Sequence, residues 1–193
     1  MGILNFVKEV FKHPRELSTI FPSSPFLANK IANQIDFSEP RTIAELGPGD
    51  GALTGELVRR MDPDSDLLLI EVVDSFCNTL EETFGEHEKF GSMEIINQGA
   101  EDLRDIMAER GMDELDYVVS GLPLTTLPDD LSDEIIHEVH GALKPGANYI
   151  QFQYSLDYKE EIEDVFGPVE VYKVWLNIFP ANVYVATKNN AAT

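Results

Sequence analysis

The chain has 193 residues, a single cysteine and a formal net charge of −21. This length is enough for one domain with a full core, and a single cysteine excludes an internal disulfide or a cluster of thiolate metal ligands. The charge opposes binding to the phosphate backbone of a nucleic acid, and no run reaches the ~18 apolar residues of a membrane span. We therefore expect a cytoplasmic protein that binds no structural metal.

Helical and strand-like patterns alternate along the chain. A period of 3.6 predicts helices at residues 3–12, 24–35, 52–61, 75–84, 101–110, 132–143 and 158–166. Short β-rich runs predict strands at residues 42–46, 67–71, 94–97, 116–120, 148–154, 169–176 and 183–187. Turn signals separate these elements at residues 63, 91, 111, 144–146 and 167–168.

This order predicts a Rossmann-like α/β fold. Alternating strands and helices indicate a seven-stranded, mostly parallel sheet with helices on both faces. The loop between the last two strands is too short for a crossover helix, so these strands should form an antiparallel hairpin. We interpret residues 1–193 as one domain, in which residues 1–35 form a helical arm that covers the active site or contacts a membrane.

The arm differs from the rest of the chain in charge. Residues 1–35 carry a balance of +2, and the remainder carries −23. The predicted helix has an apolar side formed by Ile3, Leu4, Phe6, Val7, Val10 and Phe11, with Lys8, Lys12 and Arg15 on or near its polar side. Basic amphipathic helices lie in anionic membrane interfaces, so we expect residues 3–15 to contact such a surface. The alternative is a helix that packs on the domain and never meets lipid.

Three glycines follow the first predicted strand. Gly47, Gly49 and Gly51 lie in the segment ELGPGDGALTG, and Glu45 stands two residues before the first of them. Ligands of parallel α/β sheets bind beyond the carboxyl ends of the strands. Glycines at that place let the backbone approach a ligand and adopt positive φ angles. We predict that this loop binds a ligand.

The loop also satisfies the GxGxxA form of the dinucleotide fingerprint, so two cofactors compete for it. The pyrophosphate of NAD is an anion, which Glu45 and Asp50 would repel. S-adenosylmethionine (SAM) has an α-ammonium group and a sulfonium but no phosphate, and the same carboxylates would attract it. The acid before the glycines therefore favours SAM.

Acids also follow the next two predicted strands. Glu71 ends the apolar run LLLIE, about 20 residues past the glycines, where a carboxylate can accept both ribose hydroxyls. The alternative is an exposed acid at a strand end. Gly99, Ala100 and Glu101 supply backbone amides and an acid where the adenine edge should lie, unless Glu101 only begins the next helix.

With these features, the segment IAELGPGDG at residues 43–51 resembles the first motif of class I SAM-dependent methyltransferases. The resemblance covers about residues 40–190 and implies that fold, with SAM as the cofactor. The end of the fourth strand lies beside the transferred methyl group in this fold, which adds Ser120 and Gly121 to the predicted cofactor site. That site then comprises Glu45, Gly47, Gly49, Gly51, Glu71, Gly99, Ala100, Glu101, Ser120 and Gly121.

The segment SGLPL at residues 120–124 lacks the Asn/Asp and the Tyr of methyltransferases that act on adenine or amide nitrogen. It resembles bacterial phospholipid N-methyltransferases, which convert phosphatidylethanolamine toward phosphatidylcholine. FPSSPFLA at residues 21–28, IQFQY at 150–154 and VWLNIFPA at 174–181 are similar to further motifs of that family. Phe179 replaces a proline of its Trp-x-Asn-x-Pro-Pro-Ala motif, and Gln153 stands where Thr is commoner.

The resemblance implies a phospholipid amine as the methyl acceptor. The predicted acceptor-binding residues are Phe21, Ser24, Leu122, Tyr154, Trp175, Asn177 and Phe179. Tyr154, Ser120 and Asn177 are the candidates to orient the amine lone pair, and aromatic rings can hold a methylated ammonium by cation–π attraction. Core packing is the alternative role for each aromatic residue.

Three other functions stay open. Ribosomal RNA adenine dimethyltransferases loosely share the motif at residues 21–28, although the charge of the chain disfavours RNA. A methyltransferase for a small soluble amine is a second alternative, and a non-catalytic domain that binds SAM or a membrane is a third.

Overall fold

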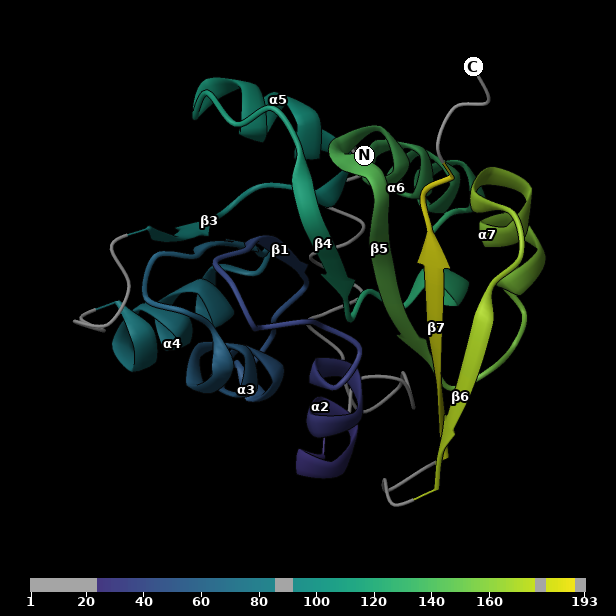
Figure 1. Cartoon of the computed structure of the whole chain (residues 1–193), viewed down its shortest axis with the longest axis horizontal. Helices are drawn as coiled ribbons and strands as arrows, with labels where there is room; N and C mark the ends of the chain where they lie inside the picture. The colour runs from purple at the N-terminus through teal and green to yellow at the C-terminus, as the bar shows by residue number, and fades with distance from the viewer. Residues whose placement is uncertain (1–23, 86–91, 176–179, 190–193) are drawn as a thin grey trace.

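The computed structural model describes residues 24–85, 92–175 and 180–189. Within these ranges, seven strands form one sheet in the order β3-β2-β1-β4-β5-β7-β6 (Figure 1). The strands are β1 (Thr42–Leu46), β2 (Asp66–Ile70), β3 (Met93–Ile96), β4 (Leu115–Ser120), β5 (Leu143–Gln153), β6 (Glu170–Val174) and β7 (Ala181–Thr187). Neighbouring strands from β3 to β5 are parallel, and β7 is antiparallel to both β5 and β6. The predicted sheet and its terminal hairpin are confirmed.

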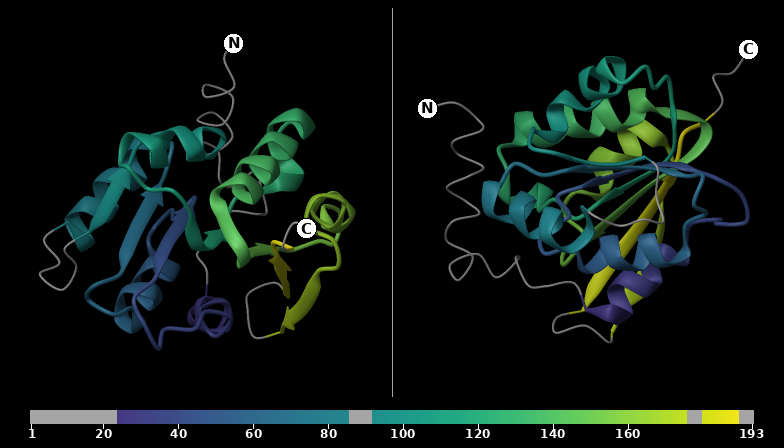
Figure 2. Two further views of the ribbon diagram at one scale, coloured as in Figure 1. Left: turned by 45° about the horizontal axis from the view of Figure 1, so that its top comes forward. Right: turned by 90° about the vertical axis from the view of Figure 1, so that its left-hand side faces the viewer.

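Helices cover both faces of the sheet (Figure 2). One face carries α2 (Pro25–Ala32), α3 (Ala52–Arg60) and α4 (Asp74–Phe84), and the other carries α5 (Leu103–Glu109), α6 (Asp129–Ala142) and α7 (Lys159–Phe166). Short 3₁₀ turns, η1 (Ala100–Asp102) and η2 (Leu124–Thr126), follow β3 and β4. The helix predicted at residues 3–12 lies outside the described ranges. No helix within those ranges has the length and apolar character needed to cross a membrane.

The central strands are apolar because they are buried on both sides. Leu67, Leu68 and Leu69 of β2 are all buried, and alternate residues face the two helical layers. This continuous burial is typical of parallel strands. The parallel strands all end at the same edge of the sheet, so the loops after β1, β2, β4 and β5 gather at one end of the molecule.

The predicted turn at residues 144–146 is instead an irregularity inside β5. Leu143 pairs with Leu115, the register then shifts, and Asn148 pairs with Tyr117. Gly146 has a φ of +83°, and its N–H donates to the carbonyl of Lys188 at 2.8 Å. Because this bond keeps the segment in the sheet, the Pro-Gly signal marks a bulge and not the end of a strand.

Part of the predicted arm packs on the domain. Helix α2 begins after Ser24, whose side chain accepts a hydrogen bond from the N–H of Leu27 at 3.2 Å. Leu27 and Ile31 are buried in the core beneath it, and burial of one such side chain stabilises the fold by about 2 kcal/mol. The lipid contact predicted for residues 3–15 lies outside the described ranges and stays a prediction.

A substitution at Gly51 should test the junction between β1 and α3. Gly51 has a φ of +81°, and an added Cβ would lie 2.6 Å from Cε2 of Phe84. We expect Gly51→Ala to lose about 1 kcal/mol of unfolding free energy from the left-handed backbone, and roughly 1–3 kcal/mol more from overpacking. Urea denaturation measures this loss. Gly49→Ala is the matched control, because Gly49 has a φ of +59° but no atom within 4 Å of an added Cβ; equal losses in the two variants would contradict the role of Phe84.

Candidate functional site

The glycine loop after β1 has the backbone that the sequence predicts. Gly47, Gly49 and Gly51 have φ angles of +67°, +59° and +81°. Their surroundings differ, because a Cβ on Gly47 would lie 2.7 Å from Cδ2 of Leu122, while Gly51 packs against Phe84. Gly47 therefore brings the loop against the turn after β4, and Gly51 serves the packing of α3 against α4.

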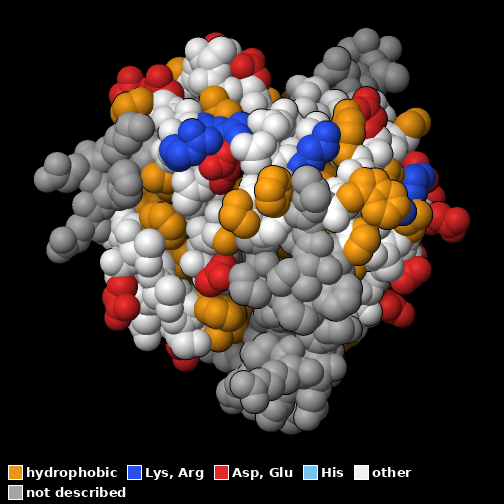
Figure 3. Space-filling model, turned by 90° about the horizontal axis from the view of Figure 1, so that it is seen from below, with side chains coloured by type: hydrophobic (Ala, Val, Ile, Leu, Met, Phe, Trp, Pro, Cys, Tyr) orange, Lys and Arg blue, Asp and Glu red, His pale blue; other side chains and the backbone are white. Residues whose placement is uncertain are grey.

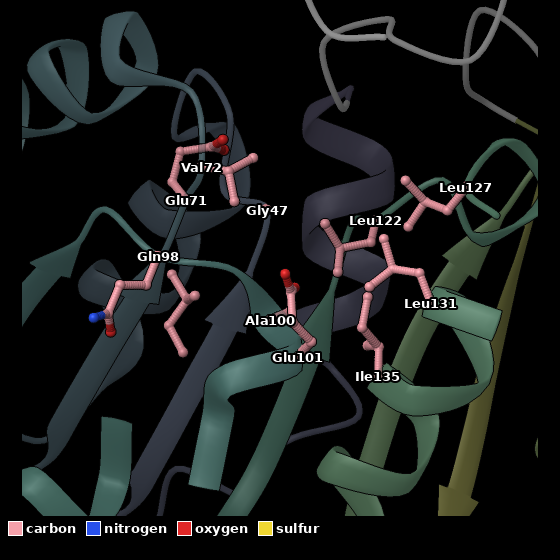
Figure 4. A pocket seen from close by; sticks show the side chains of 11 residues that line it. Gly47, Glu71, Val72, Gln98, Ala100, Glu101, Leu122, Leu127, Leu131 and Ile135 are labelled. Atoms are coloured by element: carbon pink, nitrogen blue, oxygen red, sulfur yellow. The ribbon is translucent and has the colours of Figure 1, made fainter. Parts of the chain in front are cut away.

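A first pocket lies beyond the carboxyl ends of β1, β2 and β4 (Figure 4). The part of it that the lining side chains enclose is small, about 20 Å³. Glu71 and Glu101 bring two carboxylates to its wall, whereas the described lining includes no lysine or arginine. The residues that line it are Gly47, Ile70, Glu71, Val72, Gln98, Ala100, Glu101, Leu122, Leu127, Leu131 and Ile135.

Two backbone amides orient the Glu71 carboxylate. Its Oε2 accepts a hydrogen bond from the N–H of Gly49 at 3.1 Å, and its Oε1 accepts one from the N–H of Val73 at 2.9 Å. Each carboxylate oxygen has a further lone pair that can accept from a hydroxyl. Burial raises the pKa of Glu71, and the amide bonds oppose that shift. The arrangement suits the predicted contact with a ribose.

The turn after β3 places Glu101 in the same pocket. A Cβ on Gly99 would lie 2.2 Å from the Glu101 carboxylate, so glycine leaves the room that this side chain occupies. Ala100 is buried and also lines the pocket, while Gly99 itself does not. Burial raises the pKa of Glu101, and the nearby Asp102 and Glu134 raise it further.

The side chain of Glu45 is buried inside the domain, although its position just before the glycine loop predicted a place at the ligand site. It alternates with Ala44 and Leu46 along β1, so its side chain points to the face covered by α3 and is 2% exposed. There Oε2 accepts a hydrogen bond from the hydroxyl of Thr54 at 2.8 Å. Burial raises the pKa of Glu45 to about 8, although the bond from Thr54 lowers it, and Glu71 and Asp50 add to the rise. A direct contact between Glu45 and a ligand ammonium stays a prediction.

A second pocket, of about 240 Å³, lies beside the carboxyl ends of β4 and β5. The Phe152 and Tyr154 rings meet edge to face, with centroids 6.3 Å apart, and Asp157 supplies a carboxylate at the exposed rim. The residues that line this pocket are Gly121, Leu122, Pro123, Thr125, Phe152, Gln153, Tyr154, Ser155 and Asp157. A hydrogen bond from β7 holds the loop that carries Asp157, because the Tyr184 hydroxyl donates to the carbonyl of Ser155 at 2.6 Å.

Leu122 belongs to both pockets and forms a wall between them. The hydroxyl of the fully buried Ser120 accepts a hydrogen bond from the Leu122 N–H at 3.2 Å. The side-chain amide of Gln151 donates to the Leu122 carbonyl at 3.0 Å. Ser120 lines neither pocket, so its hydroxyl shapes this wall from beneath, and its predicted contacts with donor and acceptor stay untested.

The remaining predicted acceptor residues are spread over different places. Tyr154 and Leu122 lie in the second pocket. Ser24 caps α2, and Trp175 is 69% exposed and lines neither pocket. Phe21, Asn177 and Phe179 lie outside the described residues.

Sequence reasoning missed several residues of the two pockets. Gln98 and Val72 are neighbours of predicted residues, and the rule that ligands lie past strand ends could have included them. The same rule applied to β5 points to Asp157. Leu127 directly follows η2, and Leu131 and Ile135 lie on α6. The spacing of these residues looks the same as that of ordinary core residues.

The described residues fit SAM better than a phosphate-bearing cofactor. The first pocket presents carboxylates without a compensating cation in its described lining, which favours a positively charged nucleoside and repels a pyrophosphate. Glu71 also has lone pairs for hydroxyl donors.

Comparisons with known proteins agree with this assignment. The family model described as ribosomal RNA adenine dimethylase matches residues 10–103. An ornithine lipid N-methyltransferase of Singulisphaera acidiphila is 29% identical over 187 residues, covering 93% of this chain and 92% of that protein.

Solved structures show the same fold. The SAM-dependent O-methyltransferase of Thermotoga maritima superimposes with a TM-score of 0.67 at 16% identity, covering 100% of this chain and 73% of that one. The 16S rRNA N2 G1207 methyltransferase of T. thermophilus, in complex with AdoMet and guanosine, has a TM-score of 0.66 at 18% identity, covering 90% of this chain and 45% of that one. The fold is therefore that of class I SAM-dependent methyltransferases, and SAM is the cofactor that these findings support.

Glu71 should determine cofactor affinity. In Glu71→Gln, one carboxylate oxygen becomes an NH₂ group, which cannot accept a hydrogen bond from a ribose hydroxyl or a backbone amide. Loss of one charge-assisted bond should weaken SAM binding about tenfold in isothermal titration calorimetry. Glu82→Gln, on the exposed side of α4, should bind like the wild type. Unchanged affinity in Glu71→Gln would remove this residue from the cofactor site.

Glu45 should make stability fall as pH rises. Its pKa is about 8 when folded against an ordinary value of 4.5, so between these pH values the folded state holds a proton that the unfolded state has lost. The full stability is present below about pH 4.5 and declines toward pH 8, by at most about 5 kcal/mol. Glu45→Gln has no such proton. We measure the unfolding free energy of Glu45→Gln and of the wild type in urea without SAM, and subtract the wild-type value from that of the variant. This difference should increase from about pH 5 to pH 8 and then stay level. A difference that is constant with pH would contradict the raised pKa of Glu45.

Proposed function

We propose that this SAM-dependent methyltransferase transfers methyl groups to the amine headgroup of a membrane phospholipid, phosphatidylethanolamine and its methylated derivatives toward phosphatidylcholine. The observation that carries the proposal is the pair of pockets divided by Leu122. The first is lined with carboxylates and suits a cationic methyl donor. The second combines aromatic rings with a carboxylate and suits an amine acceptor.

The second pocket has the chemistry to recognise an ammonium at each stage of methylation. The Asp157 carboxylate at its rim attracts a cation whatever the number of methyl groups. The faces of Phe152 and Tyr154 can hold methylated ammonium by cation–π attraction, which does not need N–H donors. A headgroup can therefore return to the same pocket after each transfer.

Catalysis should come mainly from positioning. When bound, SAM supplies an electrophilic methyl group on its sulfonium. Gly47, Gly121 and Leu122 bring the two pockets into contact, and an acceptor nitrogen held beside Leu122 is directed at the donor side. The amine must be neutral when it attacks, so an ammonium headgroup loses a proton before the transfer. The rim of the second pocket is exposed at Asp157, which gives that proton a route to water.

Ornithine lipid is a second candidate acceptor. The N-methyltransferase of Singulisphaera acidiphila named for it matches nearly the whole chain. Its headgroup and that of phosphatidylethanolamine both present a primary amine, so the second pocket accommodates either. The two differ in the group that accompanies the amine, and a direct comparison of the lipids decides between them.

RNA is the less favoured acceptor class. The ribosomal RNA adenine dimethylase model matches residues 10–103, a range that includes the first pocket's glycine loop but ends before β4 and the second pocket. The net charge of −21 opposes approach to a phosphate backbone. The match therefore supports SAM binding more than it supports the acceptor.

A transfer assay tests the proposal. Purified full-length protein with methyl-labelled SAM should label phosphatidylethanolamine or ornithine lipid in mixed detergent micelles, and should leave ribosomal RNA unlabelled. Asp157→Asn should lower kcat/KM for the lipid about tenfold, the loss of one charge-assisted contact, with SAM affinity unchanged. Asp164→Asn, at an exposed position on α7, is the matched control and should behave like the wild type.

Labelling of RNA with no labelling of either lipid would contradict the proposed acceptor. Wild-type kinetics in Asp157→Asn would remove the carboxylate from acceptor recognition while leaving the reaction class intact.

A further inference from the structure

Exposed apolar side chains gather at the end of the molecule where the second pocket opens. Phe26 of α2 is 60% exposed, Leu156 after β5 is 54% exposed, and Trp175 after β6 is 69% exposed. Leu156 lies between Ser155 and Asp157, which both line that pocket. Large apolar residues exposed around a site mark a surface for a partner or a membrane.

Two lysines accompany these apolar residues. Nζ of Lys30, on α2, lies 4.4 Å from the centroid of the Tyr172 ring on β6. Nζ of Lys173 lies 4.6 Å from the centroid of the Trp175 ring. The first contact joins α2 to the edge strand of the sheet. Figure 3 shows basic side chains beside hydrophobic ones over this end of the molecule.

Lys30 and Lys173 differ from the other basic residues that the structure describes. Arg41, Arg59, Arg60, Arg104, Arg110, Lys144 and Lys159 each form an ion pair with a carboxylate. Lys188 donates to the carbonyls of Gly141 and Leu143. Within the described ranges, Lys30 and Lys173 form no ion pair, so their charges are available to an anionic partner.

We propose that Phe26, Lys30, Leu156, Lys173 and Trp175 form a docking surface for an anionic lipid bilayer. This proposal rests on the proposed function, since it explains how the second pocket would face its acceptor. Aromatic side chains occupy the water interface of membranes, and lysines near an anionic surface are attracted to it. The surface includes none of residues 3–15, for which the sequence predicts a lipid contact of their own.

A lipid bilayer fits this surface better than a protein partner does. Among the described lysines and arginines, Lys30 and Lys173 are the two that bond to neither a carboxylate nor a backbone carbonyl. On a chain whose net charge is −21, the attraction that these described residues offer to an anionic surface therefore comes from this end. The apolar residues at this end come from three different segments, which are α2, the loop after β5 and the end of β6. A bilayer can receive separate side chains without matching their shapes.

The emission of Trp175 gives a direct test, because it is the only tryptophan in the chain. Full-length protein is mixed, without SAM, with vesicles of phosphatidylcholine alone or of phosphatidylcholine with phosphatidylglycerol. On the anionic vesicles, the emission should shift to shorter wavelength and be quenched by brominated acyl chains. Co-sedimentation without any shift or quenching would overturn the proposal, since binding would then use another part of the chain.

Lysine substitutions test the charge. Lys30→Gln and Lys173→Gln should each weaken partition onto the anionic vesicles about fivefold, and the double variant should weaken it about thirtyfold. Lys144→Gln is the control, because Lys144 lies at the start of β5, at the opposite end of the sheet, and is paired with Asp116. An equal loss in the control would show an effect of net charge alone and would overturn the proposal.

Other outcomes are also decisive. If the protein dimerises without lipid and Trp175→Ala abolishes the dimer, a second copy of the chain occupies this surface and the proposal fails. These vesicles contain no acceptor amine, so a docking failure is separate from a failure of the proposed reaction. Lys30→Gln and Lys173→Gln should keep wild-type transfer in detergent micelles, where no bilayer has to be found.

Discussion

The contact between the loop after β1 and the turn after β4 sets the geometry of both pockets. The N–H of Gly121 donates to the carbonyl of Leu46 at 2.9 Å, which continues the parallel pairing past the ends of the two strands. A Cβ on Gly121 would lie 3.2 Å from the carbonyl oxygen of Gly47, and one on Gly47 would lie 2.7 Å from Leu122. Because Gly47 and Gly121 have no side chains, the two loops can touch. Leu122 then forms the wall between the two pockets.

The sequence predicts those parts of the site that depend on backbone and strand order. Gly47 and Glu71 follow buried strands, and strand order alone brings them to one pocket. The depth of Glu45 could not be predicted as readily. Its orientation follows from β-strand alternation, but the partner hydroxyl of Thr54 comes from a helix whose rotation is set by packing.

Other features of the site depend on hydrogen-bond partners that are far away in the sequence, and these partners could not be predicted. Ser120 was placed correctly at the end of β4, yet its hydroxyl bonds to the backbone of Leu122, a local choice that short polar side chains commonly make. Gln151 reaches Leu122 across 29 residues of sequence, and nothing in the sequence IQFQY tells which glutamine turns inward to the turn and which lines the pocket. The turn predicted from Pro145 and Gly146 is wrong for the same reason. The carbonyl of Lys188, directly after β7, accepts a hydrogen bond from Gly146 and holds the segment in the sheet.

The positions of the lysines suggest how the acidic chain could be oriented on a membrane. Most described cations are already paired with carboxylates, so the unpaired charge over most of the protein is negative and is repelled by an anionic membrane. Lys30 and Lys173 lie at the end where the parallel strands finish and the second pocket opens. Among the described residues, this end therefore combines lysines that form no ion pair with exposed aromatic rings. The same charge that disfavours RNA would therefore orient the protein on a bilayer, with its acceptor pocket toward the lipid.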